Sequence, residues 1–174
     1  MNTQDLNNIS MNGRMAYSIL CIEKYLLTKY QNDDWSILSN EMWKATSSYW
    51  DEWDETFLEI IPEYLFEFKS YEESDFEYLT KEKYNSFVSL LNNKSSEINE
   101  MLMSLHKLCE IYSFSSIPQN GQKASEIVIR LCNILESNNI PLPNIDTVSF
   151  SIFTEKNGWG NNFDGTKLSL ILNN

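Results

Sequence analysis

The only histidine, His106, has Cys109 and Glu110 three and four residues after it. On a helix these positions share one face, so two or three of the groups could bind a metal ion. A zinc site needs further ligands, and no second cluster of histidine and cysteine supplies them. A cysteine–histidine catalytic pair also needs a third group that orients the histidine. We therefore predict no metal, no cofactor and no catalytic residue, with His106 half-packed on its helix.

Carboxylates with regular spacing are the second candidate for chemistry. Asp51, Glu55, Glu59, Glu63 and Glu67 recur every four residues. Paired carboxylates can act as general acid and base, or hold two metal ions in a helical bundle. A di-iron bundle needs Glu-x-x-His from two helices, and a single histidine excludes it. A glycosidase remains open but is disfavoured in a short helical chain. Phosphate-binding glycine loops and the G-x-S-x-G motif do not occur, so we predict that the chain is not an enzyme.

The acids concentrate in residues 50–82, which hold twelve acids and two bases. This net charge of −10 is most of the −12 of the whole chain. The same stretch is rich in aromatic residues, whereas acidic runs without them are typical of disordered tails. We expect a folded acidic surface. It is either a docking face for a cationic partner or a solvated face that keeps the protein soluble.

Composition narrows the class of partner and the location. A charge of −12 disfavours nucleic acid and anionic membrane surfaces, which both select basic proteins. No apolar run approaches the roughly 20 residues that span a bilayer. The polar start of the sequence lacks the pattern of a signal peptide. The three cysteines are far apart in apolar helical patterns, which predicts reduced, buried thiols and a cytoplasmic location.

The hydrophobic pattern predicts one domain over residues 1–174 with a mainly α fold: a helical bundle of about six helices within residues 12–138. The expected helical ranges are 12–30, 33–48, 50–68, 80–91, 95–113 and 122–137. Pro62 should end one helix near Ile60 and begin another. Residues 146–174 change character, with two alternating segments and the turn signals Asn157-Gly158 and Asp164-Gly165. They predict a small C-terminal β-hairpin or an irregular extension.

Several stretches resemble bacterial polymorphic-toxin immunity proteins of the contact-dependent growth inhibition type. They are GRMAYSILCIEKYL, IPEYLFEFKSYEESDFEYL, GQKASEIVIRLCNILESNNIPLP and NGWGNNFDGT. The resemblance would cover most of the chain, but these stretches do not form a strict signature. The resemblance implies a small, cytoplasmic, non-enzymatic antitoxin. Its partner would be a cognate toxin C-terminal domain, often a basic nuclease, whose active site or substrate surface it blocks.

The predicted toxin-binding surface joins carboxylates of the acidic stretch to two tryptophan anchors, because complementary charge and aromatic anchors favour tight pairing. It consists of Trp50, Asp51, Trp53, Asp54, Glu55, Glu59, Glu63, Glu72, Glu73 and Asp75. The alternative function is an acidic helical adaptor or regulatory protein that binds a basic partner other than a toxin.

Overall fold

Seven α-helices and several short 3-10 turns make up the described part of the chain, which confirms the predicted mainly α fold. The computed structural model describes residues 2–47, 50–112 and 115–173, and of residues 50–52 and 119 the backbone alone. The helices are α1 (Met11–Lys29), α2 (Ser36–Trp43), α3 (Trp50–Leu58), α4 (Pro62–Leu65), α5 (Lys81–Leu91), α6 (Ser96–Glu110) and α7 (Gln122–Ser137).

Local signals set the helix boundaries in the acidic stretch. Helix α3 ends at Leu58, and Pro62 is the first residue of α4, as predicted, since a proline at this position forfeits no helical hydrogen bond. Thr80 caps α5 by accepting a hydrogen bond from the backbone N–H of Lys83. After α5, Asn93 takes a left-handed conformation at φ 58° and turns the chain toward α6.

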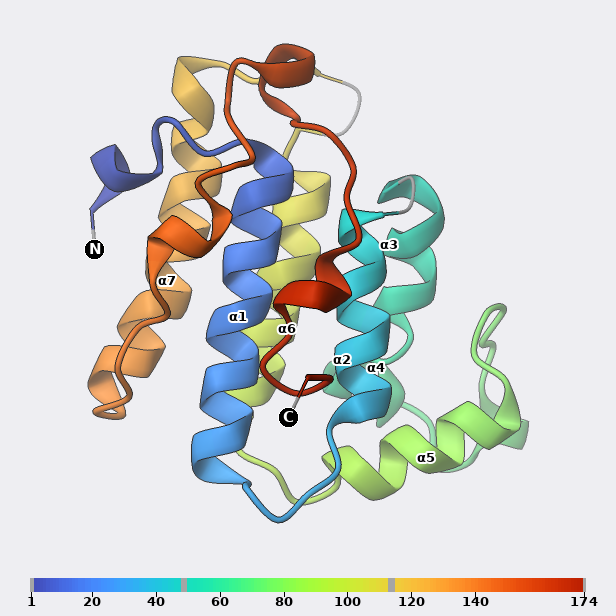
Figure 1. Ribbon diagram of the computed structural model, residues 1–174. Helices are drawn as coiled ribbons and strands as arrows, with labels where there is room; N and C mark the ends of the chain where they lie inside the picture. Colours follow the sequence, from blue (N-terminus) through green and yellow to red (C-terminus); the bar gives the residue numbers. More distant parts are fainter. Residues whose placement is uncertain (1, 48–49, 113–114, 174) are drawn as a thin grey trace.

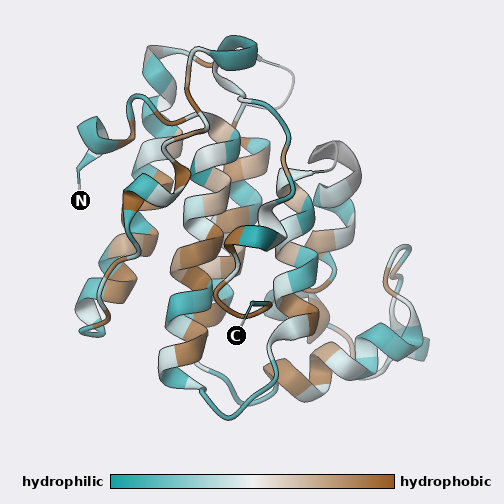
Figure 2. Cartoon of the chain, viewed as in Figure 1, coloured by the Kyte–Doolittle hydropathy of each residue, from teal (hydrophilic) through white to brown (hydrophobic). Residues whose placement is uncertain are grey.

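Helix α1 is the centre of the bundle and packs against α2, α6 and α7 (Figure 1). Each residue from Met11 to Glu23 is buried. A helix buried on all sides must place its polar residues in the core as well. Figure 2 shows apolar residues along α1 and α6 in the middle of the bundle.

Two charged residues of α1 act as buried anchors for distant segments. The guanidinium of Arg14 donates to the carbonyls of Leu6, Asn120 and Gly121 at 2.6–2.9 Å. Burial lowers the pKa of Arg14 to about 10, although Tyr112 nearby acts in the opposite direction. These bonds tie the N-terminal segment and the loop before α7 to the central helix.

Glu23 is the second anchor, and its carboxylate is fully buried. One oxygen accepts hydrogen bonds from Ser39 Oγ at 2.5 Å, Trp43 Nε1 at 2.8 Å and Ser169 Oγ at 2.6 Å. The other accepts from the backbone N–H of Leu170 at 2.6 Å. Helix α2 and the C-terminal segment are therefore held to α1 by one side chain.

The C-terminal segment forms the irregular extension, and the predicted hairpin is wrong. Its described residues contain 3-10 turns at Ile145–Val148, Glu155–Gly158 and Gly165–Leu168, and no strand pairs the two alternating segments. The first segment bonds to the N-terminal residues instead, with an isolated antiparallel bridge between Ile152 and Ile9. The second segment is bound to Glu23. Each segment makes hydrogen bonds to the rest of the protein where a hairpin would have paired it with the other.

The cysteines and the hydropathy of the helices agree with the sequence-based expectation. Cys21, Cys109 and Cys132 are free and buried. None of the described helices combines the length and apolar character needed to cross a bilayer.

Candidate functional site

The acidic stretch folds into α3 and an arm that carries most of the exposed carboxylates described for this stretch. We define the acidic arm as residues 62–80, which comprise α4, a 3-10 turn at Tyr71–Glu73 and the connection to α5. The arm lies at the edge of the molecule beside the start of α5, away from α1 and α7 (Figure 1). Phe76 fixes it by ring contacts with Phe68, Tyr71 and Tyr84, with ring centroids 5.8–6.3 Å apart.

Two carboxylates of the four-residue stripe, those of Glu55 and Glu59, accept hydrogen bonds within this structure. Both oxygens of Glu59 accept backbone hydrogen bonds from three successive residues, Glu77, Tyr78 and Leu79, at 2.6–3.2 Å. Glu55 accepts a hydrogen bond from the hydroxyl of Tyr78, and this bond raises the pKa of Tyr78. Glu55 and Glu59 therefore bind the end of the acidic arm, and the donors of the arm offset part of the repulsion between these like charges.

Of the two tryptophans predicted as anchors, Trp53 is described in full and is buried in the core. Trp53 is 4% exposed, stacks on Phe57 at 4.4 Å and donates its indole N–H to the carbonyl of Glu41 at 2.8 Å. It is a core residue, which corrects its assignment as an interface anchor. The side chains of Trp50 and Asp51 lie outside the described residues.

The other predicted carboxylates form two groups: tied carboxylates, which contact a side chain of another element, and open carboxylates, which are exposed and form no salt bridge. Asp54 faces His106 across the α3–α6 contact. Glu63 exchanges hydrogen bonds with Asn99 of α6. Glu72 pairs with Lys81, and this hydrogen bond lowers the pKa of Glu72.

Glu73 and Asp75 remain exposed, and so do Glu67 and Glu77, which the predicted surface omits. Within the described residues these four side chains have no salt bridge. The sequence shows that acidic residues are frequent in this stretch, but no local pattern distinguishes these four from the carboxylates that have partners. Only the fold of the arm back onto α3 makes this distinction.

A small recess opens between α3, α4 and the far side of the arm. Its volume is about 170 Å³, and its lining consists of Leu58, Glu59, Tyr64, Glu67, Phe68, Asp75 and Phe76. Apolar and aromatic groups form the walls, and Glu67 and Asp75 supply open carboxylates at the rim. Such a recess suits a side chain with an apolar stem and a cationic head, as in lysine or arginine.

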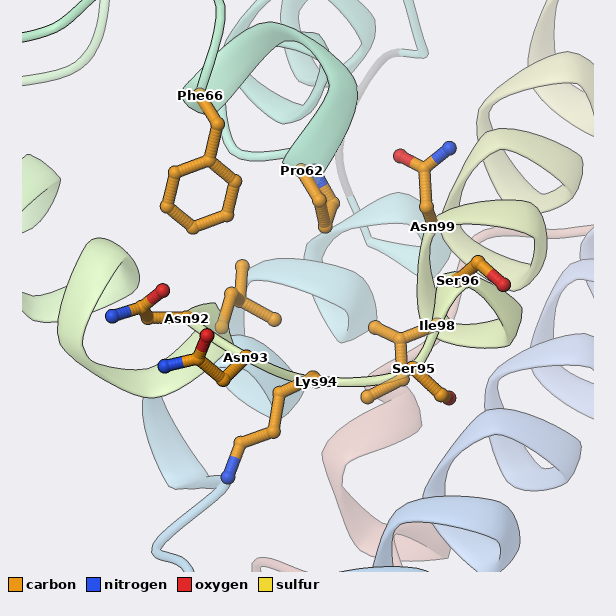
Figure 3. A pocket seen from close by; sticks show the side chains of 10 residues that line it. Pro62, Phe66, Asn92, Asn93, Lys94, Ser95, Ser96, Ile98 and Asn99 are labelled. Atoms are coloured by element: carbon orange, nitrogen blue, oxygen red, sulfur yellow. The ribbon is translucent and has the colours of Figure 1, made fainter.

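A second hollow lies on the other side of α4, with a volume of about 220 Å³. Figure 3 shows Pro62 and Phe66 facing the turn between α5 and α6. That turn contributes Asn92, Asn93 and Lys94. Phe66 is 42% exposed although it is large and apolar. The hollow offers an apolar contact next to the acidic arm, with amide groups around it.

Comparison with known proteins gives no significant match to a protein-family model, a curated protein or a solved structure.

Proposed function

We propose that this protein is an immunity protein that binds and neutralises a basic toxin domain through the acidic arm. The observation that carries the proposal is the recess with aromatic walls and open carboxylates at Glu67 and Asp75. Residues 63–77 hold six acids and one base. The recess offers a defined position for one basic side chain within this field.

The physical basis is competition for positive potential. A toxin that acts on nucleic acid must present positive charge to a polyanion, and an acidic surface attracts the same region. Complementary fields raise the association rate and orient the two proteins before contact. The apolar hollow at Phe66 gives the interface a desolvated contact beside the charged one, and such contacts usually carry much of the binding energy.

The toxin class comes from the resemblance in the sequence, and the contact surface comes from the geometry of the arm. The contact set proposed here keeps the open carboxylates Glu73 and Asp75 from the predicted surface and adds Glu67. Glu63 and Glu72 are left out, because Asn99 and Lys81 already hold them. Glu55 and Glu59 are left out, because their charge is already bound to the arm.

A tagged capture experiment tests the proposal at the level of the partner. The tagged wild-type protein is expressed in its native cells, and captured proteins are identified by mass. We expect a basic domain that arrests growth when expressed alone and is neutralised by coexpression of this chain. A basic partner without toxicity would favour the adaptor function instead, and a partner that is not basic would contradict the acidic-arm proposal.

A charge-reversal pair then tests the surface. The double variant Glu67→Lys/Asp75→Lys should weaken binding by about tenfold or more, because two attractive carboxylates become repulsive. The matched control is Glu126→Lys/Asp146→Lys, which makes the same change in net charge at exposed positions outside the arm. The control should keep wild-type affinity. Equal losses in both double variants would show that net charge, and not the arm, controls binding.

A further inference from the structure

His106 lies between carboxylates from two helices. Its Nε2 atom is 2.8 Å from Oδ1 of Asp54 on α3, and its Nδ1 atom is 3.5 Å from Oε2 of Glu110 one turn further along α6. Asp54 and His106 are 52 positions apart in the sequence, so the packing of α3 on α6 creates this cluster. It supplies the additional ligand that the sequence around His106 lacks.

The close contact between His106 and Asp54 is not a hydrogen bond. Both Nε2 of His106 and Oδ1 of Asp54 are buried, and among the described residues neither has a hydrogen-bond partner despite their 2.8 Å separation. The side chain of His106 is 7% exposed. Buried polar atoms are paired in nearly all cases, so two unpaired atoms that face each other need a physical explanation.

A cation satisfies both atoms at once. A metal ion lies on the lone-pair direction of an imidazole nitrogen, and a second ligand then sits beside that direction rather than along it. The Asp54 carboxylate, which is 2.8 Å from Nε2 without meeting hydrogen-bond geometry, fits this second-ligand position. A hydrogen bond would instead require the oxygen to be close to the N–H direction.

We propose that Asp54, His106 and Glu110 form a binding site for a divalent transition-metal ion, with Zn²⁺ the best match. One ligand atom from each residue can be chosen so that all three lie within 4.8 Å of one another. Glu110 faces Nδ1 in this structure, so its exposed side chain must turn toward Nε2 to reach an ion held there. Tetrahedral zinc with bonds of about 2.0 Å separates its ligands by about 3.3 Å, so the Asp54–His106 contact needs to open by about half an ångström. Two carboxylates and a neutral imidazole balance the ion's charge.

The ligand types select the class of ion. Imidazole nitrogen suits zinc and its neighbours in the first transition row, whereas Mg²⁺ and Ca²⁺ prefer oxygen ligands alone. Three protein ligands leave one position of a tetrahedral ion open.

The cluster has access from solvent on the side of Glu110. His106 and Glu110 line a groove of about 500 Å³ along α6. The side chain of Glu110 is 55% exposed, so it can adjust to an incoming ion. Lys107 and Arg130 line the same groove, and they favour water or an anionic group as the fourth ligand.

The metal ligands lie on α3 and α6 and not on the acidic arm, although Glu63 of the arm lines the same groove. Failure of either proposal leaves the other in place.

The test is calorimetric titration of the metal-stripped full chain with Zn²⁺, supported by chelator competition. We expect one equivalent of Zn²⁺ to bind. The variant Glu110→Gln should weaken binding by about tenfold or more, because it removes a charged ligand at an exposed position that leaves the fold intact. Asp54→Asn and His106→Gln should weaken it at least as much. The control Glu100→Gln changes another carboxylate of the same groove and should bind normally.

Substitution of Co²⁺ for Zn²⁺ distinguishes this site from binding at the three thiols. Ligation by nitrogen and oxygen gives visible ligand-field bands without a thiolate charge-transfer band. A wild-type protein that binds no zinc would overturn the proposal. So would affinity unchanged in Glu110→Gln, or a thiolate band with cobalt, since both would indicate an adventitious ion only. Because Glu110 is exposed, Glu110→Gln still tests the metal site if Asp54→Asn and His106→Gln fail to fold.

Discussion

Glu59, the residue that follows α3, accepts a hydrogen bond from the backbone N–H of Leu79 at 2.6 Å, across twenty positions of the sequence. The carboxylate closes the acidic arm onto α3, and the adjacent N–H groups of Glu77 and Tyr78 point to the same side chain. Successive backbone N–H groups form a concave anion site, and here an internal carboxylate fills it. Part of the acidic stripe thus supports the surface that the arm presents.

Glu59→Ala should loosen the arm, because three backbone donors lose their acceptor. We expect a loss of about 1–3 kcal/mol in the free energy of unfolding, measured by urea denaturation. Amide hydrogen exchange at residues 77–79 should accelerate more than in the core. Glu67→Ala is the control, since Glu67 is exposed and its removal should change stability by about 0.5 kcal/mol or less. Similar exchange rates in both variants would contradict this role of Glu59.

Glu23→Ala should be among the most destabilising substitutions in the chain. It leaves the buried donors of Ser39, Trp43 and Ser169 without their acceptor, and it also frees the backbone N–H of Leu170. We expect a loss of about 3 kcal/mol or more by urea denaturation. Limited proteolysis should then cut the C-terminal segment first. The exposed carboxylate of Glu126 provides the comparison, and a Glu23→Ala loss as small as that of Glu126→Ala would disprove the anchoring role.

Stability in acid should depend on Glu41 of α2, a buried carboxylate paired with Lys44 at 2.6 Å and Lys83 at 2.8 Å. Burial alone raises the pKa of Glu41, but the hydrogen bonds from the two lysines outweigh it and lower the pKa. Just below the ordinary glutamate pKa of about 4.3, the unfolded chain therefore binds more protons than the folded chain. The contribution of Glu41 is present above that pH and is lost as the pH falls through the folded-state pKa.

We expect the free energy of unfolding of the wild type to fall between about pH 5 and about pH 3, and to fall less steeply in Glu41→Gln. Urea denaturation across this range gives both slopes. Glu126→Gln, at an exposed carboxylate, should keep the wild-type slope. Parallel slopes in wild type and Glu41→Gln would show that the two lysine contacts do not change the proton affinity of Glu41.

Gly165→Ala should detach part of the C-terminal segment from α2. A Cβ atom at Gly165 would lie 2.4 Å from Cε3 of Trp43 and 2.5 Å from Oγ1 of Thr46, both buried. We expect a loss of about 1–3 kcal/mol, because a packed core accommodates an added methyl group poorly. Thr147→Ala in the same segment is exposed and should be close to neutral by thermal denaturation. An unchanged free energy of unfolding in Gly165→Ala would show that the segment does not pack closely against Trp43 and Thr46.

The sequence alone determined the features that act over a few residues. Helix boundaries at Pro62, Thr80 and Asn93 follow from backbone chemistry within one turn, and they were predictable. The burial of the cysteines followed from their places in apolar periodic patterns. The charge of the acidic stretch is a property of composition, so it needed no fold.

The tertiary structure decided how these elements meet. The way the arm folds back decides which carboxylates have partners. Glu59 accepts backbone hydrogen bonds from the arm, whereas Asp75 remains exposed. The alternating C-terminal pattern predicted a hairpin or an irregular extension, and its polar groups bind Glu23 and the N-terminal residues. Asp54 lies beside His106 because α3 packs against α6. Periodicity identifies the face of a helix that is buried, but the partner of that face is set by packing over the whole domain.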